Sequence, residues 1–113
     1  MIVDILKCHG TGNDFVLIDE INGSYGFTEE QRVLLAREIC DRRGPIGADG
    51  ILFVQKSTFA DGKMRIFNAD GSEPEMCGNG LRCAGRYVIE ICRKDSVEIE
   101  TMKGKYTVKK AED

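Results

Sequence analysis

The chain has 113 residues, of which 42% are hydrophobic and 31% charged, and its formal net charge at pH 7 is −3. This length and balance are typical of one soluble globular domain, and the interspersed charges argue against nucleic acid as a partner. No apolar run approaches the ~18–20 residues of a membrane span, and no secretory signal peptide is evident. Five cysteines without the spacing of a disulfide framework indicate reduced thiols, so we expect a cytoplasmic protein without a membrane partner.

The N-terminal segment predicts two β-strands separated by a glycine-rich interruption. Residues Ile2–Lys7 alternate well enough for the first strand, and Phe15–Ile18 forms the second. The interruption Cys8–Asp14 is polar and short. It fits either a hairpin turn, in which Asn13 tolerates a left-handed backbone, or a loop that presents the Asn13 amide to a ligand.

A first helix is predicted from Thr28, which forms a capping box with Gln31, to about Asp41. Its apolar residues recur at helical spacing and predict one buried stripe. They are Val33, Leu35, Ala36, Ile39 and Cys40. A second glycine-rich loop, Gly44–Gly50, follows the helix, and Asp49 is expected to anchor it by accepting backbone hydrogen bonds.

The second half of the chain places a more apolar helix between strands. Strands are predicted over residues 51–55, 63–67, 97–101 and 106–108, with hairpin signals at 60–62 and 103–104. The helix opens at Cys77, and its buried side is predicted to comprise Leu81, Ala84, Gly85, Val88, Ile91 and Cys92. A helix this apolar is best covered by a curved sheet. We therefore predict an α+β fold in which a mostly antiparallel sheet wraps around a central apolar helix.

Cys77, at the start of this helix, is the candidate reactive group. The following Gly78-Asn79-Gly80 lets the backbone turn sharply and approach a ligand closely. A helix N-terminus offers unpaired N–H groups and a partial positive charge, which favour a bound anion and a thiolate at Cys77. The plainer interpretation is a turn with Cys77 packed beneath it as a small residue. Cys40 and Cys92 fall on apolar sides of helices and are interpreted as structural.

Spacing argues against other kinds of ligand site. A dinucleotide fingerprint needs a third glycine where Cys83 stands and a strand over the polar residues 70–75, and no Gly-Lys-Ser or Gly-Lys-Thr occurs for a phosphate-binding loop. A zinc site would lack any Cys-x-x-Cys pair, whichever ligands it took from Cys8, His9, Cys77 and Cys83. We expect no metal site.

Three motifs along the chain point to one known context. They are Lys-Cys-His-Gly-Thr-Gly-Asn-Asp-Phe at residues 7–15, Gly-Ala-Asp-Gly at 47–50, and Phe-Asn-Ala-Asp-Gly-Ser-Glu at 67–73 leading to Met-Cys-Gly-Asn-Gly-Leu-Arg-Cys at 76–83. Together they resemble the N-terminal half of the diaminopimelate epimerase family, and the resemblance covers essentially the whole chain. Members are cofactor-independent amino-acid epimerases built from two similar α/β halves, with the active site in the cleft between them.

The resemblance implies roles for five residues. Cys77 corresponds to one of two catalytic cysteines. Gly78 and Asn79 would hold the substrate α-carboxylate with their backbone N–H groups, while Asn13 and Asn68 would contact the substrate through their side chains. The implied substrate is a small molecule, diaminopimelate, and no cofactor is implied.

The sequence departs from the family pattern in three places. Cys8 stands where methionine is common, a packing change expected to be harmless, and Gly50 stands where some members carry a substrate-contacting glutamine. The second half, with the partner cysteine and the groups that bind the distal end of diaminopimelate, is absent. We therefore expect residues 1–113 to be an N-terminal domain that is inactive alone. Its expected partner is the complementary C-terminal half, and without that half it is expected to self-associate as a homodimer.

Two classes of function follow. The first is interconversion of L,L- and meso-diaminopimelate by two cysteines, a step of lysine and cell-wall precursor synthesis, or the same chemistry on another amino acid by a related racemase. The second is a non-catalytic, thiol-bearing binding or redox-sensing domain that uses Cys77 and Cys83, whose spacing fits no redox motif. The run Asn-Ala-Asp-Gly-Ser-Glu at 68–73 favours the diaminopimelate branch.

Overall fold

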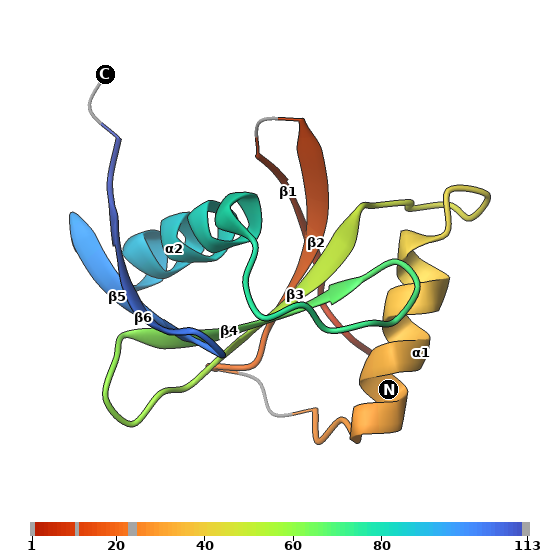
Figure 1. Ribbon diagram of the computed structural model, residues 1–113, viewed down its shortest axis with the longest axis horizontal. Coiled ribbons are helices and arrows are strands. Elements are labelled where there is room, and N and C mark those ends of the chain that lie inside the picture. The colour runs from red at the N-terminus through yellow and green to blue at the C-terminus, as the bar shows by residue number, and fades with distance from the viewer. Residues whose placement is uncertain (1, 11, 23–24, 112–113) are drawn as a thin grey trace.

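A computed structural model describes residues 2–10, 12–22 and 25–111 of the chain. Within these ranges the chain forms six strands and two helices (Figure 1). In chain order the elements are β1 (Leu6–Gly10), β2 (Asn13–Asp19), α1 (Glu29–Cys40), β3 (Gly50–Gln55), β4 (Gly62–Asn68), α2 (Gly78–Cys92), β5 (Ser96–Thr101) and β6 (Gly104–Lys109). Each helix therefore connects one pair of consecutive strands to the next pair.

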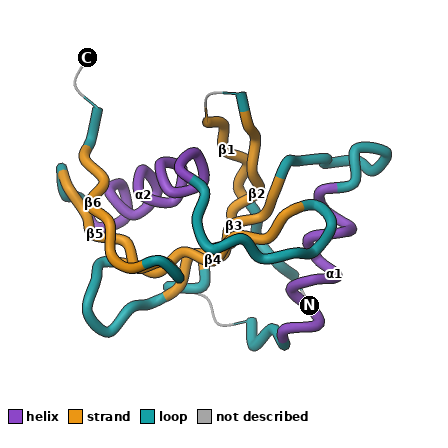
Figure 2. The backbone as a smooth tube through the Cα atoms, in the orientation of Figure 1, coloured by secondary structure: helices purple, strands orange, loops and turns teal. Residues whose placement is uncertain are grey.

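The described strands form one mixed sheet in the order β1-β2-β3-β4-β5-β6. Consecutive strands joined by short loops are antiparallel, whereas β2–β3 and β4–β5, which the helices connect, are parallel. Helical crossovers between parallel strands are almost always right-handed. Strands β4 and β5 run opposite to β2 and β3. Two right-handed crossovers therefore place α1 and α2 on opposite faces of the sheet. Figure 2 shows the two helices lying apart, with strands between them.

The sheet divides the hydrophobic core into two clusters. Leu17 and Leu52 belong to the cluster that packs against α2, while their neighbours Ile18 and Phe53 belong to the cluster that packs against α1. Successive residues of a strand point to opposite faces. Since both faces of β2 and β3 are covered, both sets of side chains are buried. This double burial explains why these two strands carry uninterrupted apolar runs instead of an alternating pattern.

Helix α2 lies against the curved sheet and contacts each of the described strands from β1 to β6. The predicted α+β architecture, a sheet wrapped around a central apolar helix, is therefore confirmed. The fit is closest at Gly85, where an added Cβ would lie 2.5 Å from Cγ1 of Val108 on β6. No helix within the described ranges is long and apolar enough to cross a membrane.

The predicted buried side of α2 is correct over most of its length. Ala84, Gly85 and Val88 are buried, as expected. The prediction is wrong for Cys92, which is exposed rather than structural, and Ile91 is also exposed. The sheet covers the helix only as far as Ile89, its last buried residue, so the apolar periodicity continues one turn beyond the burial.

Helix α1 begins and ends where the sequence predicted. The Thr28 hydroxyl accepts a hydrogen bond from the Gln31 N–H at 3.1 Å, and the Gln31 side chain accepts one from the Thr28 N–H at 2.9 Å. Within the predicted stripe, Ala36 and Cys40 are buried, and the other members are partly buried. The stripe missed Arg32, which is only 7% exposed because its guanidinium pairs with the Glu20 carboxylate at 2.9 Å.

The first hairpin is tighter than predicted. Strand β1 is Leu6–Gly10 instead of Ile2–Lys7, and β2 begins at Asn13 rather than at Phe15. Backbone pairing in an antiparallel ladder does not depend on apolar side chains, so the polar residues around the turn remain in the strands. Gly12, with a φ of +79°, provides the left-handed backbone at the turn. Asn13 is therefore placed by a strand and not by a loop.

Candidate active site at the start of helix α2

Cys77 is the N-cap residue of α2 and has an extended backbone with φ −137° and ψ 119°. Its carbonyl accepts the first hydrogen bond of the helix, from the Leu81 N–H at 2.8 Å. The N–H groups of Gly78 and Asn79 precede that bond, at the end of the helix that carries partial positive charge. Because the thiol of Cys77 is only partly buried, it can meet a ligand that binds at these amides.

The side chains of Asn13 and Asn79 come together although they are distant in the sequence. Asn79 Nδ2 donates to Asn13 Oδ1 at 2.6 Å, and Asn79 Oδ1 accepts from Arg82 Nη1 at 2.8 Å. Asn13 Nδ2 donates in turn to Asp49 Oδ2 at 3.4 Å. Both ends of the Asn13 amide are therefore held, and the first hairpin is tied to the first turn of α2.

Asp49 anchors its loop as predicted, by accepting the Asp14 N–H at 2.9 Å. Arg42 Nη2 pairs with both carboxylates, at 2.7 Å from Asp14 Oδ1 and 3.0 Å from Asp49 Oδ1. Hydrogen bonds from Arg42 and then from Lys7 hold the pKa of Asp14 well below its usual range. These groups border a polar depression of about 420 Å³ lined by His9, Gly12, Asn13, Asp14, Arg42 and Asp49.

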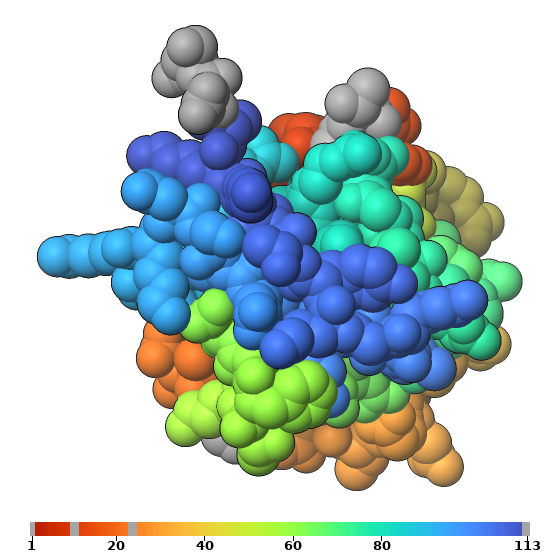
Figure 3. Space-filling view, turned by 60° about the vertical axis from the view of Figure 1, so that its left-hand side comes forward, coloured from red at the N-terminus to blue at the C-terminus, as the bar shows by residue number. Residues whose placement is uncertain are grey.

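Asn68 ends strand β4 and turns into the polar loop that leads to α2. Its N–H donates to the Ser72 carbonyl at 2.8 Å and its Nδ2 donates to Ser72 Oγ at 3.1 Å. Asn68 is exposed and pairs across the sheet with Gly50. The described side-chain hydrogen bond of Asn68 is thus to its own loop, whereas the Asn13 side chain is bonded directly to Asn79 in the first turn of α2. In the space-filling view this loop and the start of α2, in green to teal, lie beside the surface formed by β5 and β6, in blue (Figure 3).

Sequence reasoning missed two supporting residues of the site. Arg82 follows Asn79 by three positions, which places both on one face of the helix, so its contact was open to prediction. Asp49 was expected to bind backbone only, and its bond to the Asn13 side chain depends on the pairing of β2 with β3. Among the described residues, no group of three or more His, Cys, Asp or Glu side chains is arranged to hold a metal ion.

Solved structures of other proteins have the same fold as this chain. A phenazine biosynthesis protein of the PhzF family from Bacillus anthracis matches 95% of this chain and 33% of its own, with a TM-score of 0.67 and 25% identity. A hydroxyproline epimerase from Agrobacterium vitis matches 96% of this chain and 37% of its own, with a TM-score of 0.65 and 19% identity. A methylitaconate-delta-isomerase matches 100% of this chain and 61% of its own, with a TM-score of 0.63 and 18% identity. The fold is thus one found in epimerases and isomerases.

Sequence similarity identifies the family within that class. The sequence pattern of diaminopimelate epimerase matches residues 5–113, and the chain belongs to the diaminopimelate epimerase family. It is 67% identical over 111 residues to the diaminopimelate epimerase of Clostridium acetobutylicum, covering 98% of this chain and 33% of that protein. The diaminopimelate epimerase of Archaeoglobus fulgidus is 49% identical over 105 residues, which cover 92% of this chain and 37% of that protein. The chain therefore spans about a third of the length of these curated relatives.

Proposed function

We propose that the chain supplies the N-terminal part of a diaminopimelate epimerase, with Cys77 as one of its two catalytic cysteines. The observation that carries the proposal is the position of Cys77 as N-cap of α2, in a member of this family. A substrate α-carboxylate bound by the N–H groups of Gly78 and Asn79 brings the α-carbon next to the Cys77 thiol. The substrate is L,L- or meso-diaminopimelate.

Inversion at the α-carbon requires a base on one face and an acid on the other. A thiolate takes the α-proton from one face while a thiol donates a proton to the opposite face, so the configuration inverts. A single group would return the proton to the face from which it came. Cys77 serves one face in our proposal, as acid or base according to the handedness of the substrate. The amides at the helix start stabilise the negative charge that develops toward the carboxylate.

Two asparagine side chains complete the proposed substrate contacts in this chain. The Asn13 amide is held between Asn79 and Asp49, so it meets the substrate without first losing rotational freedom. Asn68 precedes the loop that leads to Cys77, and we propose that its amide contacts the substrate from the end of β4. These contacts orient the substrate and need no cofactor.

The second catalytic cysteine and the contacts to the distal end of the substrate are proposed to lie in a complementary C-terminal half. The chain's span of about a third of its curated relatives supports this division. Without that half the site stays open to water, which weakens electrostatic stabilisation of the carbanion, so residues 1–113 alone are expected to be inactive. We expect the isolated chain to cover the exposed surface by forming a homodimer, and the enzyme to work in the cytoplasm, where thiols stay reduced.

The test follows loss of the substrate α-hydrogen to deuterated water together with formation of the opposite isomer. The 113-residue chain is assayed alone, and then as a chimera in which it replaces the matching third of the Clostridium acetobutylicum relative. We expect no inversion by the chain alone and efficient inversion by the chimera. Cys77→Ala in the chimera should lower kcat by about 10²–10⁴-fold, the range for loss of an acid–base group.

Cys92→Ser is the matched control, because Cys92 is an exposed thiol at the opposite end of the same helix. This variant should keep the activity of the chimera. Inversion by the 113-residue chain alone at the chimera's rate, or a folded Cys77→Ala chimera with unchanged kcat, would contradict the proposal.

A further inference from the structure

Two further thiols, those of Cys8 and Cys83, lie where helix α2 packs against β1. Cys8 comes from β1 and Cys83 from the second turn of α2, and both residues line the same depression in the surface. Cys83 is only 2% exposed, whereas Cys8 is partly buried and packs against the core cluster that contains Cys83. Two groups that are distant in the sequence are thus neighbours in the fold.

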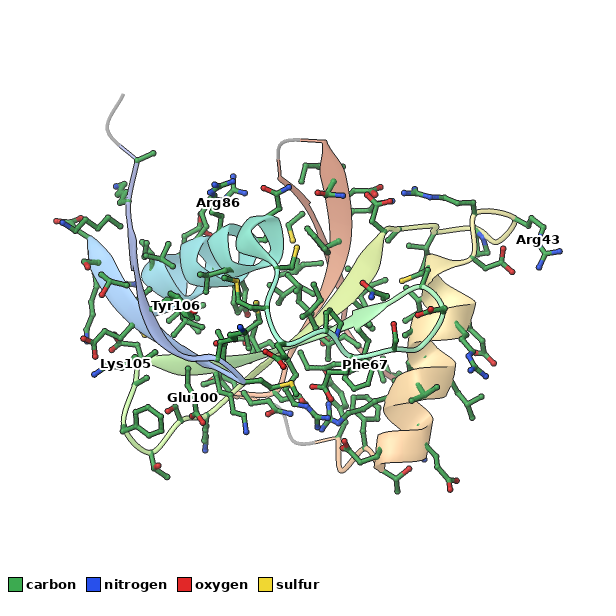
Figure 4. The ribbon with its side chains drawn as sticks, in the orientation of Figure 1. Arg43, Phe67, Arg86, Glu100, Lys105 and Tyr106 are labelled. Carbon is green, nitrogen blue, oxygen red and sulfur yellow. The ribbon has the colours of Figure 1, made fainter. Side chains whose placement is uncertain are left out.

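Cys8 and Cys83 lie at one depression in the surface. The depression has a volume of about 370 Å³, and its lining includes Cys8, His9, Cys83 and Arg86. The Arg86 guanidinium donates to the His9 carbonyl at 3.0 Å and to Cys83 Sγ at 3.9 Å. Arg86 lies on the upper side of α2 in Figure 4. A small solute that enters the depression therefore approaches the partly exposed Cys8, with the buried Cys83 and the positive charge of Arg86 beside it.

The contacts of the pair favour a thiolate on Cys83 and a thiol on Cys8. The hydrogen bond from Cys8, followed by that from Arg86, lowers the pKa of Cys83 to about 7 despite its burial. The same bond to Cys83, together with burial, raises the pKa of Cys8. A thiolate next to a protonated thiol is the arrangement in which one sulfur reacts and the other resolves the product.

We propose that Cys8 and Cys83 form a redox-active dithiol that a hydroperoxide converts into an intramolecular disulfide linking β1 to α2. The inference rests on these two residues and Arg86 and does not depend on the proposed epimerase activity. It also differs from the redox-sensing alternative considered from the sequence, which paired Cys83 with Cys77. The partner of Cys83 is Cys8, a residue that sequence spacing does not place beside it.

The reaction balances with hydrogen peroxide as the oxidant. The Cys83 thiolate attacks one peroxide oxygen, the O–O bond breaks, and the departing hydroxide takes a proton to become water, leaving a sulfenic acid on Cys83. The Cys8 sulfur then attacks the Cys83 sulfur, the S–O bond breaks, and the hydroxyl leaves as water with the Cys8 proton. The two thiols lose two electrons in total, and one peroxide is reduced to two waters.

The experiment treats the purified chain with a small excess of hydrogen peroxide, blocks remaining thiols with N-ethylmaleimide, and maps peptides by mass spectrometry without reduction. We expect a loss of 2 Da, a linked peptide pair containing Cys8 and Cys83, and reversal by dithiothreitol. Cys8→Ser should abolish the linked pair and Cys92→Ser, which alters an exposed thiol outside the depression, should not.

The pH dependence of disulfide formation gives a second readout. The charged and titratable groups facing the pair are Lys7 and His9 from β1 and Arg86, Tyr87 and Glu90 from α2. With a reactive thiol whose pKa is about 7, the initial rate at pH 8 should be roughly tenfold that at pH 6. An ordinary thiol, with a pKa near 8.5, would instead change by roughly 80-fold over that interval.

A probe that needs no variant guards against loss of folding by Cys8→Ser. Phenylarsine oxide, a trivalent arsenical, bridges two adjacent thiols with release of one water, and on the folded wild-type chain we expect it to bridge Cys8 and Cys83. Disulfides that instead involve Cys77 or Cys92, or arsenical bound elsewhere while Cys8 and Cys83 stay free, would overturn the proposal.

Discussion

The amide of Asn13 illustrates how single residues hold the candidate site in one arrangement. Its oxygen accepts from Asn79 and its nitrogen donates to Asp49, so an amide flip would place like groups against each other. Asp49 is itself held, because it accepts the Asp14 N–H and pairs with Arg42. A substrate contact made by Asn13 thus depends on charged residues that need not touch the substrate.

We predict that acid weakens the fold partly through Asp14. Its pKa is lower in the folded chain than in the unfolded chain because Arg42 first, and then Lys7, hydrogen-bond to its carboxylate. A lowered folded pKa contributes stability that is complete above the unfolded value of about 3.9 and is lost as the pH falls toward the folded value. The free energy of unfolding, measured with urea, should therefore fall less between pH 7 and pH 3 for Asp14→Asn than for the wild-type chain.

Glu75→Gln provides the matched control for this measurement. Its side chain is 65% exposed, and Glu75 Oε2 lies 3.4 Å from Lys103 Nζ. A surface ion pair of this kind contributes little to stability. For this control, the change in unfolding free energy between pH 7 and pH 3 should equal that of the wild-type chain. An equal pH difference in Asp14→Asn and wild type would show that Arg42 and Lys7 do not stabilise the fold through Asp14.

The two helices are attached to the sheet by different physical means. Helix α1 docks through a buried ion pair: Arg32 is bidentate to Glu20, and its guanidinium carbon lies 4.5 Å from the centre of the Phe53 ring. Gln55 also donates to the same carboxylate, at 2.8 Å. Helix α2 packs so near β6 at Gly85 that an added Cβ would lie 2.5 Å from Val108 Cγ1. Beyond the two apolar clusters, a buried ion pair thus helps to position α1, and the absence of a side chain at Gly85 allows α2 to approach β6.

We predict that Gly85→Ala destabilises the fold by about 1–3 kcal/mol, the usual cost of overpacking a core. An added Cβ would lie 2.5–2.6 Å from three side-chain atoms of Val108, so α2 and β6 must move apart. Gly78→Ala is the control, because no described atom lies within 4 Å of a Cβ at Gly78. Thermal and urea unfolding should show a loss for Gly85→Ala and no loss for Gly78→Ala, and equal stability of the two variants would refute close packing at Gly85.

At the scale of the whole molecule, stability is expected to be greatest in the middle of the sheet. Strands β2 and β3 are paired on both sides and covered on both faces, whereas β6 has a described neighbour strand only in β5 and alternates between exposed and partly buried residues. Opening of the central strands requires loss of both core clusters. The amides of the central strands should therefore open only with global unfolding.

Hydrogen exchange followed by mass spectrometry tests this gradient. Peptides that cover β3 should exchange slowest, and peptides that cover β6 should exchange fastest among the strands. The comparison is made at low protein concentration and again at high concentration. Protection of β6 equal to that of β3 at low concentration would contradict the gradient, and protection of β6 only at high concentration would indicate that self-association covers this edge.

Interactions over a few residues could be predicted from the sequence. The capping box of Thr28 and Gln31, the alternation of β5 and the start of α2 at Cys77 depend on neighbours within about one helical turn or one strand. The motifs around Cys77 that resemble the family are likewise short runs of consecutive residues. The fold class and the candidate reactive residue therefore followed from the sequence.

Contacts between distant segments were decided only by the tertiary structure. The parallel pairing of β2 with β3 brings Asp49 to Asn13, and the position of α2 against β1 brings Cys83 to Cys8. The burial of Arg32 depends on a carboxylate from another element in the same way. The physical reason is that these contacts depend on which faces meet when the helical crossovers close the sheet. Side-chain periodicity identifies a face to be buried but does not specify its partner.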